Sequence, residues 1–170
     1  AGGQGEEDAW GGVLGVTKGL VGKHSRKRVM DTPLSESAYI GAAIGAAACG
    51  LRPVAELMFL DFMGVCFDQI FNQAAKFKYM FGGKAETPVV IRGMVGGGFR
   101  AAAQHSQSPY SMWMHLAGLK IVLPASPADA KGLLKAAIRD NNPVVSFECH
   151  RLNALIGPVP EGDHIVPIGV

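Results

Sequence analysis

The sequence predicts an α/β domain built on a mainly parallel sheet whose two faces are covered by helices. Short apolar segments that favour strands alternate with segments long enough for helices. Strands joined by connections of that length run parallel, and a parallel sheet is buried on both faces. The chain has 170 residues, 48% of them hydrophobic, which suits one domain with a buried core.

Five short segments are expected to form strands because they are apolar or β-branched and end at turn-forming residues. They are Arg28–Met30, Pro53–Met58, Pro88–Ile91, Lys120–Leu123 and Val144–Glu148. The Gly-rich stretch Arg92–Gly98 is expected to be a loop.

Three segments favour helices. Glu36–Cys49 consists mostly of Ala, Ile and Gly, with Ser35 as N-cap and Gly50 as the stop. So little side-chain bulk suits close approach to a neighbour, including one across a subunit boundary. Phe62–Met80 places apolar residues near helical spacing with polar residues between them. The segment from Ser126 to about Asp140 opens with Ser-Pro-Ala-Asp, a strong helix start.

Charge and cysteine content exclude several functional classes. The net charge of +2 leaves no dense basic stripe for nucleic-acid binding. No apolar run is long and Gly-free enough to span a bilayer, and the Gly-rich, acidic N-terminus is not a signal peptide. The three cysteines fit neither a disulfide framework nor a zinc site, which favours a reducing, cytoplasmic location.

The loops that follow strands are the places to search for a site, because ligands bind at the carboxyl ends of parallel strands. Three such loops end at Glu36, at Phe62 and at His105. Glu36 is either a surface acid that complements a helix dipole or a carboxylate that faces a cavity. Phe62 suits the core as well as a stacking platform, and His105 is either structural or a proton donor and acceptor near neutral pH. The residues alone therefore give two polar candidates and no reaction.

Five motifs follow one another along the chain in an order typical of one family. They are Arg28–Glu36 (RVMDTPLSE), Gly45–Pro53 (GAAACGLRP), Asp68–Gly83 (DQIFNQAAK, then YMFGG), Ala102–Gln107 (AAQHSQ) and Pro127–Leu133 (PADAKGL). On these motifs the chain resembles the pyrimidine-binding domain in the beta subunit of thiamine-diphosphate-dependent acetoin and 2-oxo acid dehydrogenases, which are transketolase-like. Trp10–Gly19 and Phe59–Asp68 look most like the acetoin dehydrogenase branch.

The resemblance implies a three-layer thiamine-diphosphate-binding fold with a mainly parallel sheet flanked by helices. Residues 1–156 are then expected to be a transketolase-like pyrimidine-binding domain with a truncated N-terminal end. Residues 157–170 are expected to begin a linker to a C-terminal domain that is absent from this chain. The chain has no Gly-Asp-Gly motif followed by Asn, so the resemblance implies an alpha subunit that holds the diphosphate and Mg²⁺. Activity is expected only with that subunit, in a heterotetramer of two alpha and two beta chains.

The resemblance also assigns roles to three residues. Glu36 matches the glutamate that bonds the pyrimidine ring nitrogen and thereby promotes loss of the proton from the thiazolium carbon. Phe62 matches the aromatic residue that packs on the pyrimidine face. His105 matches a histidine at the mouth of the site, which handles the substrate oxygen or the proton traffic of the cofactor adduct.

A potassium ion is a further implied ligand, because some relatives bind one through backbone carbonyls. The matching positions are Val89, Ala137, Asp140 and Asn142.

The implied function is that of the beta-subunit part of the first component of an acetoin dehydrogenase complex. Such a component cleaves acetoin and passes the acyl unit to a lipoyl-bearing acyltransferase component. The alternative is the beta subunit of a pyruvate or branched-chain 2-oxo acid dehydrogenase component, which releases carbon dioxide instead. Two more hypotheses stay open: a non-catalytic fragment that keeps the fold, and a single-chain relative such as a transketolase or deoxyxylulose-phosphate synthase.

Overall fold

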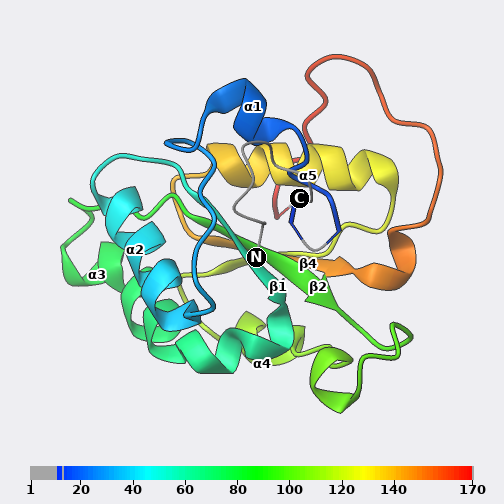
Figure 1. Cartoon of the computed structure of the whole chain (residues 1–170). Coiled ribbons are helices and arrows are strands. Elements are labelled where there is room, and N and C mark those ends of the chain that lie inside the picture. Colours follow the sequence, from blue (N-terminus) through cyan, green and yellow to red (C-terminus); the bar gives the residue numbers. More distant parts are fainter. Residues whose placement is uncertain (1–10, 13, 170) are drawn as a thin grey trace. The chain divides into compact units, whose positions relative to one another are not determined.

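The computed structural model describes residues 11–12 and 14–169 (Figure 1). The Gly-rich acidic N-terminus, and Trp10 and Val13 of the opening motif, lie outside the described residues. The chain divides into two compact units, Ala1–Ser35 and Glu36–Val170. The expected boundary between residues 156 and 157 stays a prediction.

The first unit contains α1 (Leu20–His24), which begins after Gly19 in the left-handed conformation. The expected strand Arg28–Met30 is wrong, because this segment forms a turn. The backbone N–H groups of Arg28 and Val29 both donate to the Ser25 carbonyl, at 3.1 and 3.0 Å. They are therefore unavailable for pairing with a sheet.

The second unit is built on a parallel sheet of four strands, which confirms the expected fold class. The strands are β1 (Val54–Phe59), β2 (Val90–Val95), β3 (Lys120–Val122) and β4 (Val144–Cys149). Their order in the sheet is β1-β2-β4-β3, and each neighbouring pair is parallel.

Two helices form where the sequence places them, α2 (Glu36–Ala48) and α5 (Pro127–Arg139). The Ser126 hydroxyl caps α5 by accepting the Asp129 N–H at 3.1 Å. Gly50 ends α2 with a φ of 93°, and the next N–H, that of Leu51, reaches back to the Ala46 carbonyl at 3.0 Å. This six-residue closure is a Schellman cap, which favours glycine.

The segment Phe62–Met80 is helical but is not the single amphipathic α-helix that was expected. It forms a 3₁₀ helix, η1 (Leu60–Cys66), then a π-helix, η2 (Gln69–Ala74), and then the short α3 (Phe77–Met80). The spacing of the buried side chains explains the change. Leu60, Met63 and Cys66 are three apart, which suits three residues per turn, whereas Cys66, Ile70 and Ala74 are four apart.

Strand β2 is longer than expected, because it includes the first four residues of the stretch Arg92–Gly98. All six residues of β2 are buried. A Cβ atom on Gly93 would lie 3.0 Å from Cγ of Leu60 and 3.2 Å from the Leu57 carbonyl oxygen. This glycine therefore serves close packing within the sheet, and the loop itself begins at Gly96, where φ is 97°.

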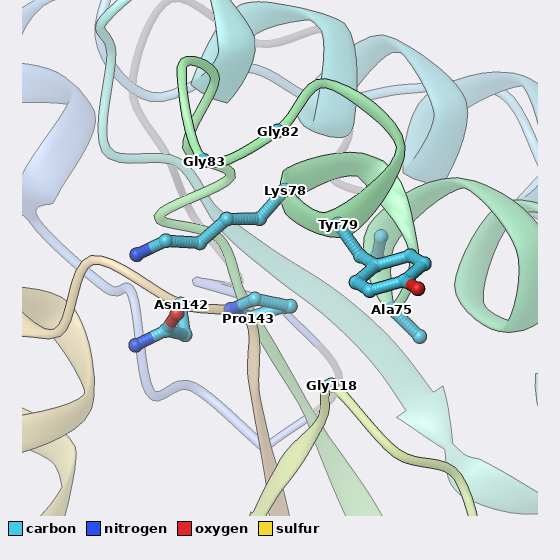
Figure 2. A pocket seen from close by; sticks show the side chains of 9 residues that line it. Ala75, Lys78, Tyr79, Gly82, Gly83, Gly118, Asn142 and Pro143 are labelled. Carbon is cyan, nitrogen blue, oxygen red and sulfur yellow. The ribbon is translucent and has the colours of Figure 1, made fainter.

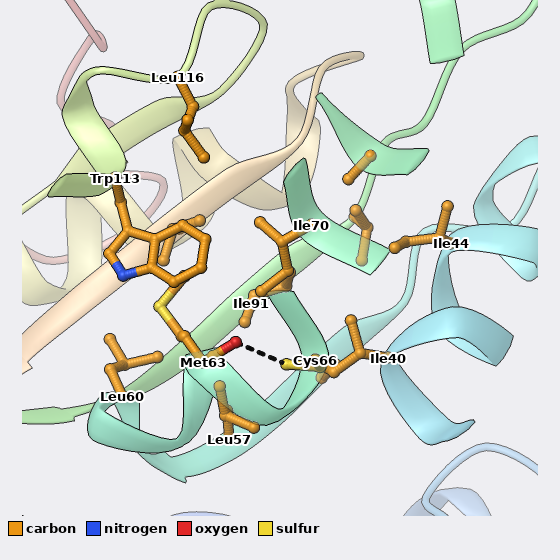
Figure 3. Packing of buried hydrophobic residues seen from close by; sticks show 14 of the residues in the cluster. Ile40, Ile44, Leu57, Leu60, Met63, Cys66, Ile70, Ile91, Trp113 and Leu116 are labelled. Carbon is orange, nitrogen blue, oxygen red and sulfur yellow. Dashed lines mark hydrogen bonds between the residues drawn. The ribbon is translucent and has the colours of Figure 1, made fainter. Parts of the chain in front are cut away.

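Alternate strand residues build two separate cores, one on each face of the sheet. Ile91, Val145 and Phe147 join α2, η1 and η2 in the larger core (Figure 3). Val90 and Val144 pack against α5 in the smaller one. Helices thus cover both faces, which gives the three expected layers.

Residues 157–169 form no helix or strand, and they contact α5. The Lys131 ammonium donates to the Pro160 carbonyl at 2.6 Å, and Arg139 bonds both oxygens of Asp163 at 3.0 and 3.1 Å. Among the described residues, no helix has both the length and the apolar run needed to cross a bilayer.

Candidate functional site

The three residues expected to form a site lie on elements that meet at the carboxyl edge of the sheet. Glu36 is the first residue of α2. Phe62 lies in η1, which follows β1 directly, and His105 ends η3 (Ala103–His105), which follows β2. All three side chains are half-buried.

The first turn of α2 is bonded to the end of η1. The Ser37 hydroxyl donates to the Val65 carbonyl at 2.6 Å. This bond fixes the helix that carries Glu36 against the helix that carries Phe62, on the buried face formed by Ile40 and Cys66 (Figure 3).

The Glu36 carboxylate acts on two neighbouring acids through its charge. Burial raises the pKa of Cys66 to about 11; a bond to the backbone opposes this rise, and the charge of Glu36 adds to it. Burial and then Glu36 likewise raise the pKa of Tyr39. The negative charge of Glu36 therefore affects the side chains that pack between α2 and η1.

His105 packs by its edge against two aromatic rings. Its ring centroid lies 5.3 Å from that of Phe62 and 4.7 Å from that of Phe59, with interplanar angles of 73° and 82°. The structure thus brings Phe62 and His105 together. The Nδ1 atom of His105 is buried and has no hydrogen-bond partner in the described part of the chain.

Asp61, which no sequence motif marked as functional, anchors the loop that carries His105. Its Oδ1 atom accepts the backbone N–H of Gln107 at 3.0 Å and the side-chain amide at 2.9 Å. The Gln107 carbonyl in turn accepts the Gly96 N–H at 2.8 Å. An acid directly after a buried strand, within the loop that ends at Phe62, is the signal that points to Asp61.

A second histidine, also unmarked by the sequence, extends this aromatic cluster. Phe99 packs on Phe59 at 5.7 Å and on His150 at 5.7 Å. His150 lies in η4 (His150–Leu152), directly after β4, and its Nδ1 atom is 3.2 Å from the Val95 carbonyl. Since a carbonyl only accepts, this contact requires a proton on Nδ1 of His150.

Three non-glycine residues near the site adopt positive φ angles. They are Met58 (28°), Arg100 (61°) and Ala102 (71°). Met58 immediately precedes Phe59 and coincides with a register shift between β1 and β2. Such conformations cost roughly 1–3 kcal/mol each and cluster at functional sites.

The four residues matched to a potassium site lie at the opposite, amino edge of the sheet. The Val89 carbonyl accepts the Val144 N–H at 3.0 Å, and the Ala137 carbonyl accepts the Asp140 N–H at 3.2 Å. The Asp140 carbonyl accepts the guanidinium of Arg52 at 2.9 Å. Three of the four carbonyls therefore already accept a hydrogen bond, and the potassium site stays a prediction.

A hollow of about 450 Å³ also opens at this amino edge (Figure 2). Lys78 and Tyr79 of α3 line it together with Asn142 and Pro143, which precede β4. It contains none of Glu36, Phe62 and His105, so the hollow and the candidate site are separate. Within the described ranges, no group of three or more His, Cys, Asp or Glu side chains could hold a metal ion.

Comparisons with known proteins place this geometry in a family. The profile described as "Transketolase, pyrimidine binding domain" matches residues 4–154. The beta subunit of an acetoin:2,6-dichlorophenolindophenol oxidoreductase from Cupriavidus necator is 70% identical over 169 residues, which cover 99% of this chain and 50% of that protein. Its counterpart from Bacillus subtilis is 59% identical, with coverages of 96% and 48%.

A more distant relative is matched over a similar share of its length. The 2-oxoisovalerate dehydrogenase subunit beta of Bacillus subtilis is 49% identical over 160 residues, with coverages of 94% and 49%. The chain thus spans about half the length of these curated relatives. A solved structure of a split gene transketolase, described as an inactive beta4 tetramer, has a TM-score of 0.55 and 24% identity. The match covers 67% of this chain and 34% of the transketolase chain, and it supports only the fold.

The profile match spans most of the chain, and the parallel sheet with its two helical layers agrees with it. The chain therefore belongs to the family of transketolase pyrimidine-binding domains.

Proposed function

We propose that this chain is the pyrimidine-binding part of the beta subunit of a thiamine-diphosphate-dependent acetoin dehydrogenase component. The observation that carries the proposal is the arrangement of Glu36, Phe62 and His105 on adjoining elements at the carboxyl edge of the sheet. The cofactor, when bound, supplies the carbanion chemistry, while the protein supplies orientation and proton control.

Glu36 would hold the pyrimidine by its ring nitrogen. A half-buried carboxylate at the first position of a helix can accept a hydrogen bond and can also exchange a proton. An amide of the same shape accepts the hydrogen bond but does not exchange the proton. The charge of Glu36 acts on Tyr39 and Cys66, so the carboxylate lies close to the contact between α2 and η1.

Phe62 and His105 would complete the wall of the site. The Phe62 ring is half-buried and offers an aromatic surface to a flat heterocycle. His105 is held by its edge against that ring, and we infer that Nε2 of its imidazole exchanges a proton with the substrate oxygen.

Acetoin is the substrate we favour, and a 2-oxo acid is the alternative. The two relatives named for acetoin are 70% and 59% identical to this chain, against 49% for the one named for 2-oxoisovalerate. We further propose a heterotetramer with an alpha subunit that holds the diphosphate and Mg²⁺, and a lipoyl-bearing acyltransferase as acceptor of the acyl unit. The three cysteines are unpaired, which supports a location in the reducing cytoplasm.

Potassium is proposed as a structural ligand of the carbonyls of Val89, Ala137, Asp140 and Asn142. Its place at the amino edge of the sheet is remote from Glu36, Phe62 and His105. It would therefore stabilise the end of α5 rather than take part in the reaction.

The proposed function is tested with the full-length beta chain co-expressed with its alpha subunit. Calorimetric titration of thiamine diphosphate with Mg²⁺ should give one site per alpha–beta pair. Glu36→Gln should keep binding within several-fold but lower turnover at least about a hundredfold, because the amide cannot exchange the proton. Glu161→Gln, which removes an exposed acid from the C-terminal segment, is the matched control and should change neither quantity.

Substrate choice is measured on the same complex with 2,6-dichlorophenolindophenol as oxidant. Reduction of the dye with acetoin, and at least tenfold less with pyruvate or a branched-chain 2-oxo acid, is the expected result. The reverse preference would establish the 2-oxo acid alternative. Absence of cofactor binding with the alpha subunit present would instead favour the non-catalytic fragment.

A further inference from the structure

Two buried polar atoms of the candidate site lack partners. They are Oδ2 of Asp61 and Nδ1 of His105. A buried polar atom without a partner destabilises the folded state, and more so when it carries charge. The described residues include only two other such atoms, on Trp113 and His164, which are not part of this site.

The two atoms belong to segments that are fastened together at three points. The ring of His105 packs on Phe59 and on Phe62, which flank Asp61 in the chain. Two residues after His105, Gln107 donates its backbone N–H and its side-chain amide to Oδ1 of Asp61. The second oxygen of this carboxylate and Nδ1 of the imidazole therefore belong to two segments that these contacts hold against each other.

The chemistry of the two atoms is complementary. An ionised carboxylate only accepts hydrogen bonds, whereas one nitrogen of a neutral imidazole donates and the other accepts. Neither atom is hydrogen-bonded to any described residue, the other atom included. One bond, formed by a small rotation of the two side chains or through a single enclosed water, satisfies both atoms at once.

We propose that Asp61 accepts the Nδ1–H of His105 and thereby fixes the tautomer of this imidazole. The free lone pair then belongs to Nε2, which is the nitrogen left to face the substrate. Asp61 is a positioning residue, because it acts on the substrate only through His105. The catalytic importance of this role rests on the proposed function, but the tautomer of His105 does not depend on the cofactor.

A pair of this kind determines the direction of proton transfer. With the proton held on Nδ1, Nε2 first accepts a proton and then returns it, and the carboxylate stabilises the imidazolium between the two steps. If the proton were on Nε2 instead, His105 would begin as a donor. Asp61 therefore decides whether His105 starts as a base or as an acid.

The tautomer is measured by ¹⁵N NMR of the sedimented, histidine-labelled complex of full-length alpha and beta chains without cofactor. The His105 signals are those that disappear in His105→Gln. We expect Nδ1 of His105 to carry the proton in the natural protein. In Asp61→Asn the amide oxygen can keep the Gln107 bonds while the amide N–H₂ turns to His105, so the proton should move to Nε2.

His150 serves as an internal reference, because its Nδ1 faces the Val95 carbonyl and should stay protonated in both proteins. Gln107→Ala is the matched control: it loosens the same loop without changing the carboxylate, so the His105 tautomer should persist. In turnover assays, Asp61→Asn should lower kcat at least about tenfold with little change in KM, and Asp61→Glu should restore part of it.

A natural protein with the His105 proton on Nε2 would overturn the proposal, and so would an Asp61→Asn variant with an unchanged tautomer. The first result does not depend on Asp61→Asn, so a failure of that variant to fold leaves the test intact. Thiamine diphosphate binding is a separate measurement. A complex with the expected tautomer but no cofactor binding would retain the Asp61–His105 pair and reject the proposed function.

Discussion

The hydroxyl of Ser37 donates a 2.6 Å hydrogen bond to the carbonyl of Val65, and this bond joins two helices far apart in the sequence. Val65 lies in η1, the element that also contains Phe62, and Ser37 directly follows Glu36 in the sequence. The position of Glu36 relative to η1, which carries Phe62, thus depends on a side-chain contact as well as on core packing.

Ser37→Ala should weaken cofactor binding without abolishing it. Loss of one hydrogen bond costs about 1 kcal/mol, and the first turn of α2 gains freedom next to Glu36. The dissociation constant for thiamine diphosphate, measured by calorimetry on the full complex, should rise several-fold while kcat stays nearly constant. Ser35→Ala is the control, since that hydroxyl donates to the Pro33 carbonyl within its own turn. Equal effects of the two variants would contradict this explanation.

Glu36→Gln should lower the pKa of the Cys66 thiol. Burial first, and the charge of Glu36 in addition, raise that pKa to about 11. Removing the charge favours the thiolate at a given pH. Because Cys66 is buried, the thiolate is followed by its ultraviolet absorbance, as the difference from the same titration of Cys66→Ala. Glu86→Gln, on an acid that pairs with Lys78, should leave the titration unchanged.

The raised pKa of Cys66 makes the stability of the folded state fall at high pH. A thiol whose pKa is raised on folding stabilises the folded state fully below its ordinary pKa, near 9, and loses that contribution as the pH rises through 11. Tyr39, whose pKa burial also raises, acts in the same direction. The thermal midpoint should therefore fall between pH 9 and 11, and less so in Cys66→Ala.

Much of the fold followed from local patterns. The Ser126 cap and the Gly50 stop depend on neighbouring residues alone, and both helices formed as expected. The Phe62–Met80 segment differed because its helix type follows the spacing of residues that reach the core, and that spacing depends on what they pack against. Gly93 looked like a loop residue but is required by the Leu60 side chain, a contact between distant parts of the chain.

The site was predicted only in part for a similar reason. Glu36, Phe62 and His105 come from the family resemblance, and their roles stay predictions; the structure shows that the rings of Phe62 and His105 are in contact. Asp61 and His150 were missed because their importance lies in what they touch. Asp61 bonds Gln107, 46 positions away, and His150 contacts Val95, 55 positions away. No spacing rule relates such residues.

Potassium should raise the thermal midpoint of the full complex if the carbonyls of Val89, Ala137, Asp140 and Asn142 bind it. At a concentration a hundredfold above the dissociation constant, a bound ligand stabilises the folded state by about 2.7 kcal/mol. The measurement compares calorimetric unfolding in potassium, sodium and choline chloride at equal ionic strength. Identical midpoints in the three salts would reject the site. In that case the Arg52 guanidinium, which bonds the Ile138 and Asp140 carbonyls, and the Lys120 ammonium, which pairs with the Asp140 carboxylate, would supply the positive charge there.

Arg92→Met should destabilise the domain strongly, because Arg92 lies between two carboxylates in the middle of the sheet. Its guanidinium bonds both oxygens of Glu148 and lies 3.5 Å from Glu56, so one side chain joins β1, β2 and β4. Burial alone would lower the pKa of Arg92, but the bond to Glu148 and the charges of both acids raise it. Removing the cation leaves two poorly solvated negative charges, which costs about 3 kcal/mol.

The loss is measured by urea unfolding of the full complex, with Arg139→Met as the matched control. Arg139 pairs with the exposed Asp163, and an exposed ion pair contributes at most about 1 kcal/mol. If repulsion between the acids is the cause, adding Glu56→Gln and Glu148→Gln to Arg92→Met should recover most of the stability. A triple variant as unstable as the single one would show that the three strands need the hydrogen bonds of Arg92 rather than its charge.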